Sequence, residues 1–160
     1  MKRLLVVALV VALAGCGGSK SSSDTTSTVK LAGSKLGRIL VDHKGRTLYL
    51  FASDTGGKST CNGSCAATWP PLTASSPSAG SGVDHGALGT TTRADGTQQV
   101  TYHGHPLYTY AGDGSAPGST KGEALKTYGG VWYVVDGAGK GVQPASSGSE
   151  MGGSRGSYGY

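Results

Sequence analysis

Short apolar segments alternate with glycine-rich polar segments through the middle of the chain. Residues 36–42 (LGRILVD) and 47–51 (TLYLF) flank a four-residue polar segment, 43–46, that contains a glycine. This spacing predicts a β-hairpin. The apolar positions of 36–42 are dense enough for a mostly buried strand.

The same pattern returns in the second half of the chain. Residues 88–93 and 98–102 flank the sequence Ala94-Asp95-Gly96-Thr97, which is typical of a hairpin turn. The sequence VWYVV at 131–135 predicts the last strand.

Helical signals are weak. Residues 64–68 and 122–127 could each form a turn or two of helix, whereas the 29 glycines among 160 residues favour turns and close strand packing. The predicted fold class is all-β: a small meander, sandwich or barrel.

One ten-residue segment occurs twice, which indicates that one structural unit has been duplicated. Residues 45–54 read GRTLYLFASD and residues 104–113 read GHPLYTYAGD. On a strand, alternate side chains point to opposite faces, so Tyr49 and Phe51 should share one face and Leu48 and Leu50 the other. The second copy repeats this arrangement, with Tyr108 and Tyr110 opposite Leu107, and ends in Asp113 as the first ends in Asp54.

The N-terminus has the pattern of an export signal. Two basic residues precede an apolar run of about ten residues, which is shorter than the roughly 20 residues of a membrane span. The run ends in Leu13-Ala14-Gly15-Cys16, which resembles the lipobox of bacterial lipoproteins. That resemblance implies cleavage after residue 15 and acylation of Cys16. The alternative is an ordinary secretory signal with an incidental cysteine.

Composition divides the rest of the chain into three parts. Residues 16–29 form a Gly/Ser/Thr-rich linker after the lipidated cysteine, and residues 137–160 form a second Gly/Ser-rich tail, so both are predicted to be flexible. Between them, residues 30–136 contain nearly all the aromatic side chains and form the duplicated β domain, with repeats at about 36–72 and 98–136.

The net charge of the chain indicates which classes of partner to expect. The formal net charge is +5, and removal of Lys2 and Arg3 with the signal would leave +3. So small an excess, without a run of basic residues, does not predict a nucleic-acid partner. No nucleophile elbow, P-loop or dinucleotide-binding glycine pattern occurs, so no enzyme activity and no cofactor are predicted.

The repeated motif Y-x-[FWY]-x-x-D, read here as YLFASD and YTYAGD, resembles that of predicted bacterial lipoproteins called secreted repeat proteins of unknown function. Further matches are Cys61-Asn62-Gly63-Ser64-Cys65, the sequence WPPL at 69–72, and GGVWY at 129–133. The resemblance implies an exported lipoprotein with a duplicated β unit. It implies no activity.

Cysteines offer one candidate chemistry. With Cys16 lipidated, Cys61 and Cys65 remain as a pair in an oxidising compartment, and three intervening residues permit a disulfide across a tight turn. A redox-active pair and a metal-binding thiolate are the alternatives. The only basic residue of the loop itself is Lys58, which predicts an inert bridge.

Histidines offer a second candidate chemistry. His103 and His105 would point the same way on an extended backbone and are weak candidates for copper or zinc ligands, with His43 near them in the alignment of the repeats. Exposed turn residues are the favoured interpretation, and no metal site is predicted.

The motif residues themselves have structural and functional interpretations. Asp54 and Asp113 precede Gly-rich loops, where a carboxylate most often accepts hydrogen bonds from backbone amides two residues on. Cation binding or acid–base chemistry is the alternative. The aromatic pairs are expected to pack in the core, and a sugar-binding platform is the alternative.

Together these observations predict a lipid-anchored extracytoplasmic protein that acts as a non-enzymatic binding or structural module of the bacterial cell envelope. Its expected partners are the membrane, through the acyl chains, and an envelope protein or glycan. A redox or metal-handling accessory protein is the alternative.

Overall fold

The computed structural model describes residues 27–143, which form three small antiparallel sheets. The first sheet pairs β1 (Val29–Ser34) with β2 (Gly37–Asp42). The second has the order β3 (Tyr49–Phe51), β8 (Gly130–Val134), β7 (Lys126–Thr127), and the third the order β4 (Leu88–Thr92), β5 (Gln98–Tyr102), β6 (His105–Pro106). Short helices are α1 (Ser64–Thr68) and the 3₁₀ turns η1 (His85–Ala87) and η2 (Ala111–Asp113).

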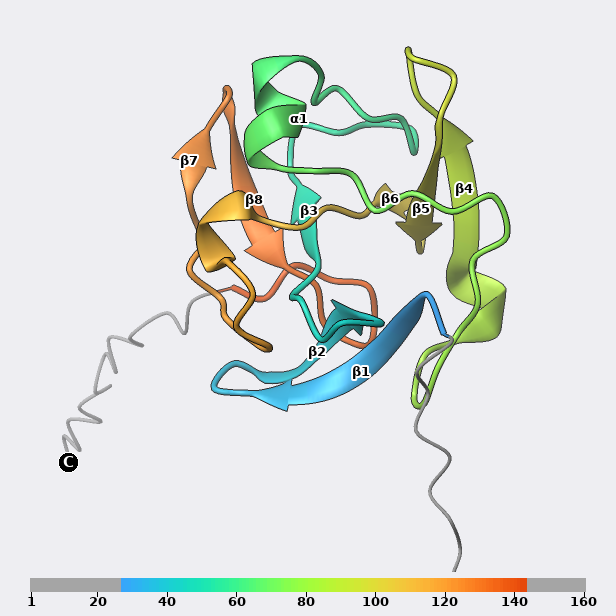
Figure 1. Cartoon of the computed structure of the whole chain (residues 1–160), viewed down its shortest axis with the longest axis vertical. Helices are drawn as coiled ribbons and strands as arrows, with labels where there is room; N and C mark the ends of the chain where they lie inside the picture. The colour runs from blue at the N-terminus through green and yellow to red at the C-terminus, as the bar shows by residue number, and fades with distance from the viewer. Residues whose placement is uncertain (1–26, 144–160) are drawn as a thin grey trace, which may run out of the picture.

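The sheets surround a common interior. Figure 1 shows β1 and β2 across the bottom of the molecule, the β3–β8–β7 sheet on one side and the β4–β5–β6 sheet on the other. The predicted all-β class, with two similar units, is confirmed. Among residues 27–143, no helix is long and apolar enough to cross a membrane.

Each repeat is completed by a segment of the other. In the first, the amide of Leu48 donates to Leu40, Leu40 donates to Val135, and Val135 donates to Leu48, at N–O distances of 2.8–3.0 Å. The second has the same triangle of donors and acceptors, formed by Leu107, Val100 and Leu72. The end of the second repeat therefore pairs with the first, and the end of the first repeat pairs with the second.

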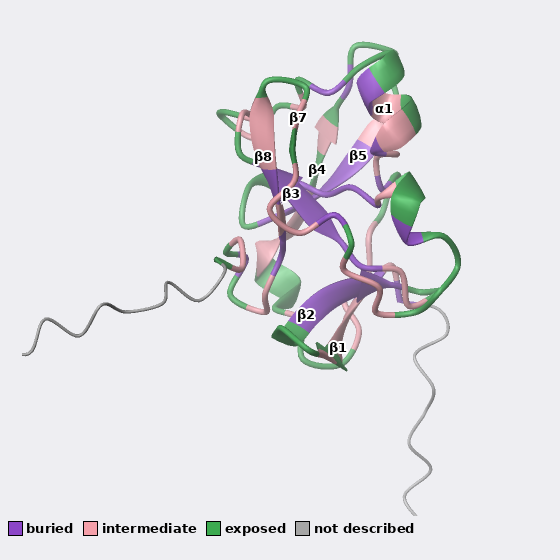
Figure 2. Cartoon of the chain, turned by 90° about the vertical axis from the view of Figure 1, so that its left-hand side faces the viewer, coloured by how far each residue is buried: buried purple, intermediate pink, exposed green. Residues whose placement is uncertain are grey.

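The predicted two-faced pattern of the repeat strand is confirmed. Tyr49 and Phe51 belong to one buried cluster, and Leu48 and Leu50 to another. The second copy divides in the same way: Tyr108 lies in the first cluster and Leu107 in the second. Figure 2 shows that β2, β3 and β5 are the strands most enclosed by the rest of the fold.

One of the two predicted helical segments is correct. Residues 64–68 form α1, but the prediction for 122–127 is wrong, because these residues form a turn followed by β7. Ala124 has a positive φ of 58°, and its amide donates to the carbonyl of Trp132. Pairing with β8 therefore overrides the local helical tendency.

The folded unit is longer than the sequence predicted at both ends. β1 was not among the predicted strands, and the strand predicted from residue 36 begins at Gly37. At the other end, the amide of Val142 donates to Val134, beyond the boundary predicted at 136. The signal at 1–15, Cys16, most of the linker and the tail from 144 lie outside the described residues.

Candidate functional site

The motif tyrosines and aspartates bind each other across the two repeats. The Tyr49 hydroxyl donates to Asp113 Oδ2 at 2.7 Å, and the Tyr108 hydroxyl donates to Asp54 Oδ2 at 2.6 Å. Between them, Tyr49 and Tyr108 pair through two reciprocal backbone hydrogen bonds of 2.8 and 2.9 Å. The motif is therefore a reciprocal clasp, in which each repeat supplies the acceptor for the donor of the other.

The second oxygen of each aspartate holds a loop. Asp54 Oδ1 accepts from the amide and the hydroxyl of Thr60, both at 2.7 Å. Asp113 Oδ1 accepts from the Ser119 hydroxyl at 2.9 Å and from the Lys121 amide at 2.8 Å. Both aspartates thus accept from backbone amides, but these lie six and eight residues along the chain, and the predicted reach of two residues is wrong.

Burial fixes the protonation of the tyrosines. Burial, followed by the Asp113 carboxylate, raises the pKa of Tyr49 far above its usual value, and burial together with Asp54 does the same to the pKa of Tyr108. Both phenols are therefore neutral donors throughout the physiological pH range. Because acid–base catalysis needs a pKa close to the working pH, these tyrosines are suited to holding a proton and not to transferring it.

Two tryptophans meet at the centre of the molecule. The Trp69 and Trp132 rings stack with centroids 3.9 Å apart and an interplanar angle of 1°. Phe51 stacks on Trp132 at 4.2 Å and Tyr110 on Trp69 at 4.3 Å. Both tryptophans are fully buried, and Tyr110 packs against the same cluster. The motif aromatics therefore form core, and the alternative of an exposed sugar-binding platform does not apply to them.

The predicted disulfide is confirmed. Cys61 and Cys65 are bonded, with Cα atoms 5.2 Å apart. Their exposed fractions are 1% and 6%, so both residues are buried. This burial favours a bridge that shapes the loop over a pair that exchanges with other thiols.

Arg93 holds the cysteine loop from behind, a role that sequence reasoning missed. Its guanidinium donates to the Cys61 carbonyl at 2.7 Å, to Gln99 at 2.6 Å and to Ser59 at 2.7 Å. Arg93 is only 6% exposed, and its nearest carboxylate oxygen, in Asp95, lies 3.9 Å from Nε. Neither spacing nor repeat alignment links residue 93 to the cysteines, so no sequence signal was available.

The four histidines lie on the surface. His43, His85, His103 and His105 are all exposed, the first and third in turns. Within residues 27–143, no group of three or more His, Cys, Asp or Glu side chains is placed to hold a metal ion.

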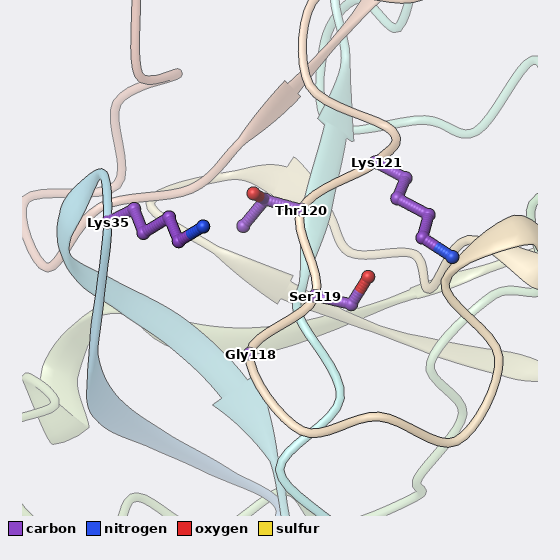
Figure 3. Close-up of a pocket in the computed structure, with 5 residues that line it drawn as sticks. All are labelled: Lys35, Gly118, Ser119, Thr120 and Lys121. Carbon is purple, nitrogen blue, oxygen red and sulfur yellow. The ribbon is translucent and has the colours of Figure 1, made fainter.

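A polar hollow in the surface lies where the loop after Asp113 meets the β1–β2 turn. It has a volume of about 370 Å³ and is lined by Lys35, Gly118, Ser119, Thr120 and Lys121. In Figure 3, Lys35 extends toward Thr120 on one side of the loop, whereas Lys121 and Ser119 project from the other side. No carboxylate lines it. A second shallow hollow, of about 400 Å³, lies beside the β7–β8 hairpin.

Acidic and basic side chains differ in the partners that they contact. All seven carboxylates of residues 27–143 accept hydrogen bonds from the protein's own amides or hydroxyls. Of the ten basic side chains in the same range, only Arg46 and Arg93 lie within 4 Å of a carboxylate. The other eight are Lys30, Lys35, Arg38, Lys44, Lys58, Lys121, Lys126 and Lys140.

The reciprocal clasp predicts energetic coupling between the repeats. Tyr49→Phe should lower the free energy of unfolding by about 1–3 kcal/mol, because it leaves the Oδ2 atom of Asp113 without its donor. Asp113→Asn should cost a similar amount, and the double variant should cost less than the sum by about 1 kcal/mol or more. Urea unfolding of the four proteins measures the cycle.

Tyr133→Phe is the matched control for this cycle. The Tyr133 hydroxyl has no hydrogen-bond partner among residues 27–143, so its removal should change stability by less than about 0.5 kcal/mol. Additive effects of Tyr49→Phe and Asp113→Asn would contradict the coupling.

The buried bridge predicts slow exchange with external thiols. We expect a midpoint below about −300 mV for Cys61–Cys65, because both cysteines are buried. The double variant Cys61→Ser/Cys65→Ser should remain folded and lose about 2 kcal/mol, since the closed loop is short. Redox titration followed by alkylation and mass measurement tests this; a midpoint well above about −250 mV would support a redox-active pair.

Comparisons with known proteins agree with the duplicated architecture. A family model described as a secreted repeat of unknown function matches residues 30–73 and 89–136. No curated protein and no solved structure matches the chain. The description of the family places its members outside the cytoplasm. The two matched segments cover more than half of the chain and coincide with the two halves of the clasp, so the protein belongs to the family of secreted repeats of unknown function.

Proposed function

We propose that the protein is a lipid-anchored, non-enzymatic binding module of the bacterial cell envelope, which binds an anionic component through its basic surface. The observation that carries this proposal is that the acidic side chains have partners within the fold and most of the basic side chains have no acidic partner. Seven carboxylates hold loops and turns within the fold, while eight basic side chains have no carboxylate within 4 Å in the described part of the chain.

Surface ammonium groups without partners act on anions at close range. At physiological ionic strength the Debye length is about 8 Å, so each charge is felt only near the surface. Scattered lysines with a net excess of +3 therefore give modest, salt-sensitive affinity. A low affinity is sufficient for a tethered protein, because tethering raises the effective concentration of partners in the same layer.

The lipid anchor would determine how far from the membrane the protein acts. Cys16 would carry two or three acyl chains, which together hold a protein firmly at a membrane. Twelve residues (17–28) separate Cys16 from Val29, the start of β1. A Gly/Ser-rich chain of this length has a root-mean-square span of about 20 Å, so the β domain would act close to the lipid surface.

The alternative function, a redox or metal-handling accessory, has less support. Both cysteines of the disulfide are buried, and within residues 27–143 no histidine belongs to a group of three or more side chains that could hold a metal ion.

Anchoring predicts a defined mature N-terminus. We expect mass spectrometry to find a mature chain that begins at Cys16 with diacylglycerol attached, and we expect the protein to partition into detergent. Cys16→Ser should abolish both properties. An unmodified Cys16, or a chain that retains Met1, would contradict the lipoprotein proposal.

Binding predicts dependence on charge and salt. The mature chain should be retained on immobilised anionic envelope polymer at 20 mM NaCl and released below about 500 mM, because counterions compete for the lysines. It should not be retained on dextran, a neutral polysaccharide. Equal retention on dextran, or retention that salt does not change, would contradict an electrostatic binding module.

A further inference from the structure

We propose that the hollow between the β1–β2 turn and residues 118–121 is the binding site, and that its ligand is an extended polymer of phosphodiester groups. This inference rests on the proposed function and names its ligand and location. It depends on four features of the hollow: its charge, its free donors, its rigidity and the direction of its two lysines.

The side chains that line the hollow are positively charged or neutral. Lys35 and Lys121 are exposed and have no carboxylate within 4 Å. Two acidic residues lie near the loop in sequence, and neither lines the hollow. Asp113 is 6% exposed and both of its oxygens accept hydrogen bonds from within the protein, and Glu123 is half-buried and accepts from the Val134 amide. The Gly118 amide donates to the Gly45 carbonyl, which joins this loop to the turn after β2. An anion entering the hollow meets ammonium groups first.

Free hydrogen-bond donors lie between the two lysines. Among the described residues, neither the amide nor the hydroxyl of Thr120 has a partner, and Thr120 is half-buried in the lining. A backbone amide, a hydroxyl and an ammonium group together match the several acceptor oxygens of a phosphate. Lysine binds phosphate as a point charge and needs no fixed plane, unlike arginine.

The loop is held in place before any ligand arrives. Asp113 accepts from Ser119 and from the Lys121 amide, and the Gly118 amide donates to Gly45 at 3.0 Å. Pro117 also packs closely against Gly45, where an added Cβ would lie 3.1 Å from it. Binding therefore requires little ordering of the backbone, which favours affinity.

The direction of the lysines selects an extended ligand. Figure 3 shows Lys35 on one side of the loop and Lys121 projecting from the other, so they do not converge on one point. A single phosphate cannot meet both ammonium groups in this arrangement. A chain with repeated phosphodiester groups can place one group beside Lys35 and Thr120 and another beside Lys121.

Two charge-matched double variants test the site. Lys35→Gln/Lys121→Gln removes two charges at the hollow, whereas Lys126→Gln/Lys140→Gln removes two exposed lysines that do not line it. The probes are poly(glycerol phosphate) and polygalacturonate, binding to the mature chain at several salt concentrations. The first variant should weaken binding of poly(glycerol phosphate) about tenfold or more and the second less than about threefold.

The salt dependence gives an independent readout. Losing two phosphate contacts should lower the slope of log K against log salt by about 1.4, and the control variant should leave it unchanged. Thr120→Val should weaken binding severalfold without changing the slope, since it removes a hydroxyl and no charge. All the substituted side chains are exposed or half-buried, so urea unfolding should be unchanged.

Each of the other possible results of this binding experiment would contradict one part of the proposal. Equal losses in both double variants would mean diffuse charge, which removes this site but leaves the proposed function intact. Equal affinity for polygalacturonate would overturn the phosphate class. Equal affinity of the unlipidated chain for phosphatidylglycerol vesicles, lost in Lys35→Gln/Lys121→Gln, would overturn the polymer as ligand in favour of lipid headgroups. Failure of the unsubstituted chain to bind any anionic polymer would overturn the proposed function itself.

Discussion

The reciprocal bonds between Tyr49 and Asp113 and between Tyr108 and Asp54 determine how the two repeats combine. A carboxylate this close to the core is costly to desolvate unless its oxygens accept several hydrogen bonds. Each aspartate meets that condition only by taking a phenol from the other repeat and amides or hydroxyls from its own loop. The aspartate of each half therefore has all of its hydrogen-bond donors only when the other half is present.

The tryptophan stack follows from the same exchange. Trp69 lies at the end of the first repeat and Trp132 at the end of the second, and each end segment pairs with the opposite repeat. The exchange brings both rings to the centre, face to face at 3.9 Å. Small residues make room for them: at Gly122 an added Cβ would lie 2.8 Å from Trp69 and 2.9 Å from Tyr49. A glycine there is required by packing and not by backbone conformation.

Features encoded within a single segment could be predicted from the sequence, and features that join distant segments could not. Alternation of side chains placed Tyr49 and Leu48 on opposite faces correctly, because that pattern depends on local strand geometry. The repeat revealed two units, but a duplicated motif does not state whether Asp113 binds its own tyrosine or that of the other copy. Arg93 was missed for the same reason: its contact with Cys61 spans 32 residues and has no periodic signal.

The hydrogen bonds that the carboxylates accept also affect the charge of the surface. A Gly-rich chain with few helices leaves many turn amides without partners, and Asp42, Asp95 and Asp136 accept from such amides in three separate turns. An acidic side chain bound in this way has less capacity to neutralise a lysine nearby. The basic character of the exterior is thus a consequence of how the turns are held. The loop at 118–121 is an example, because Asp113 accepts from the Lys121 amide while the Lys121 side chain projects away from it into solvent.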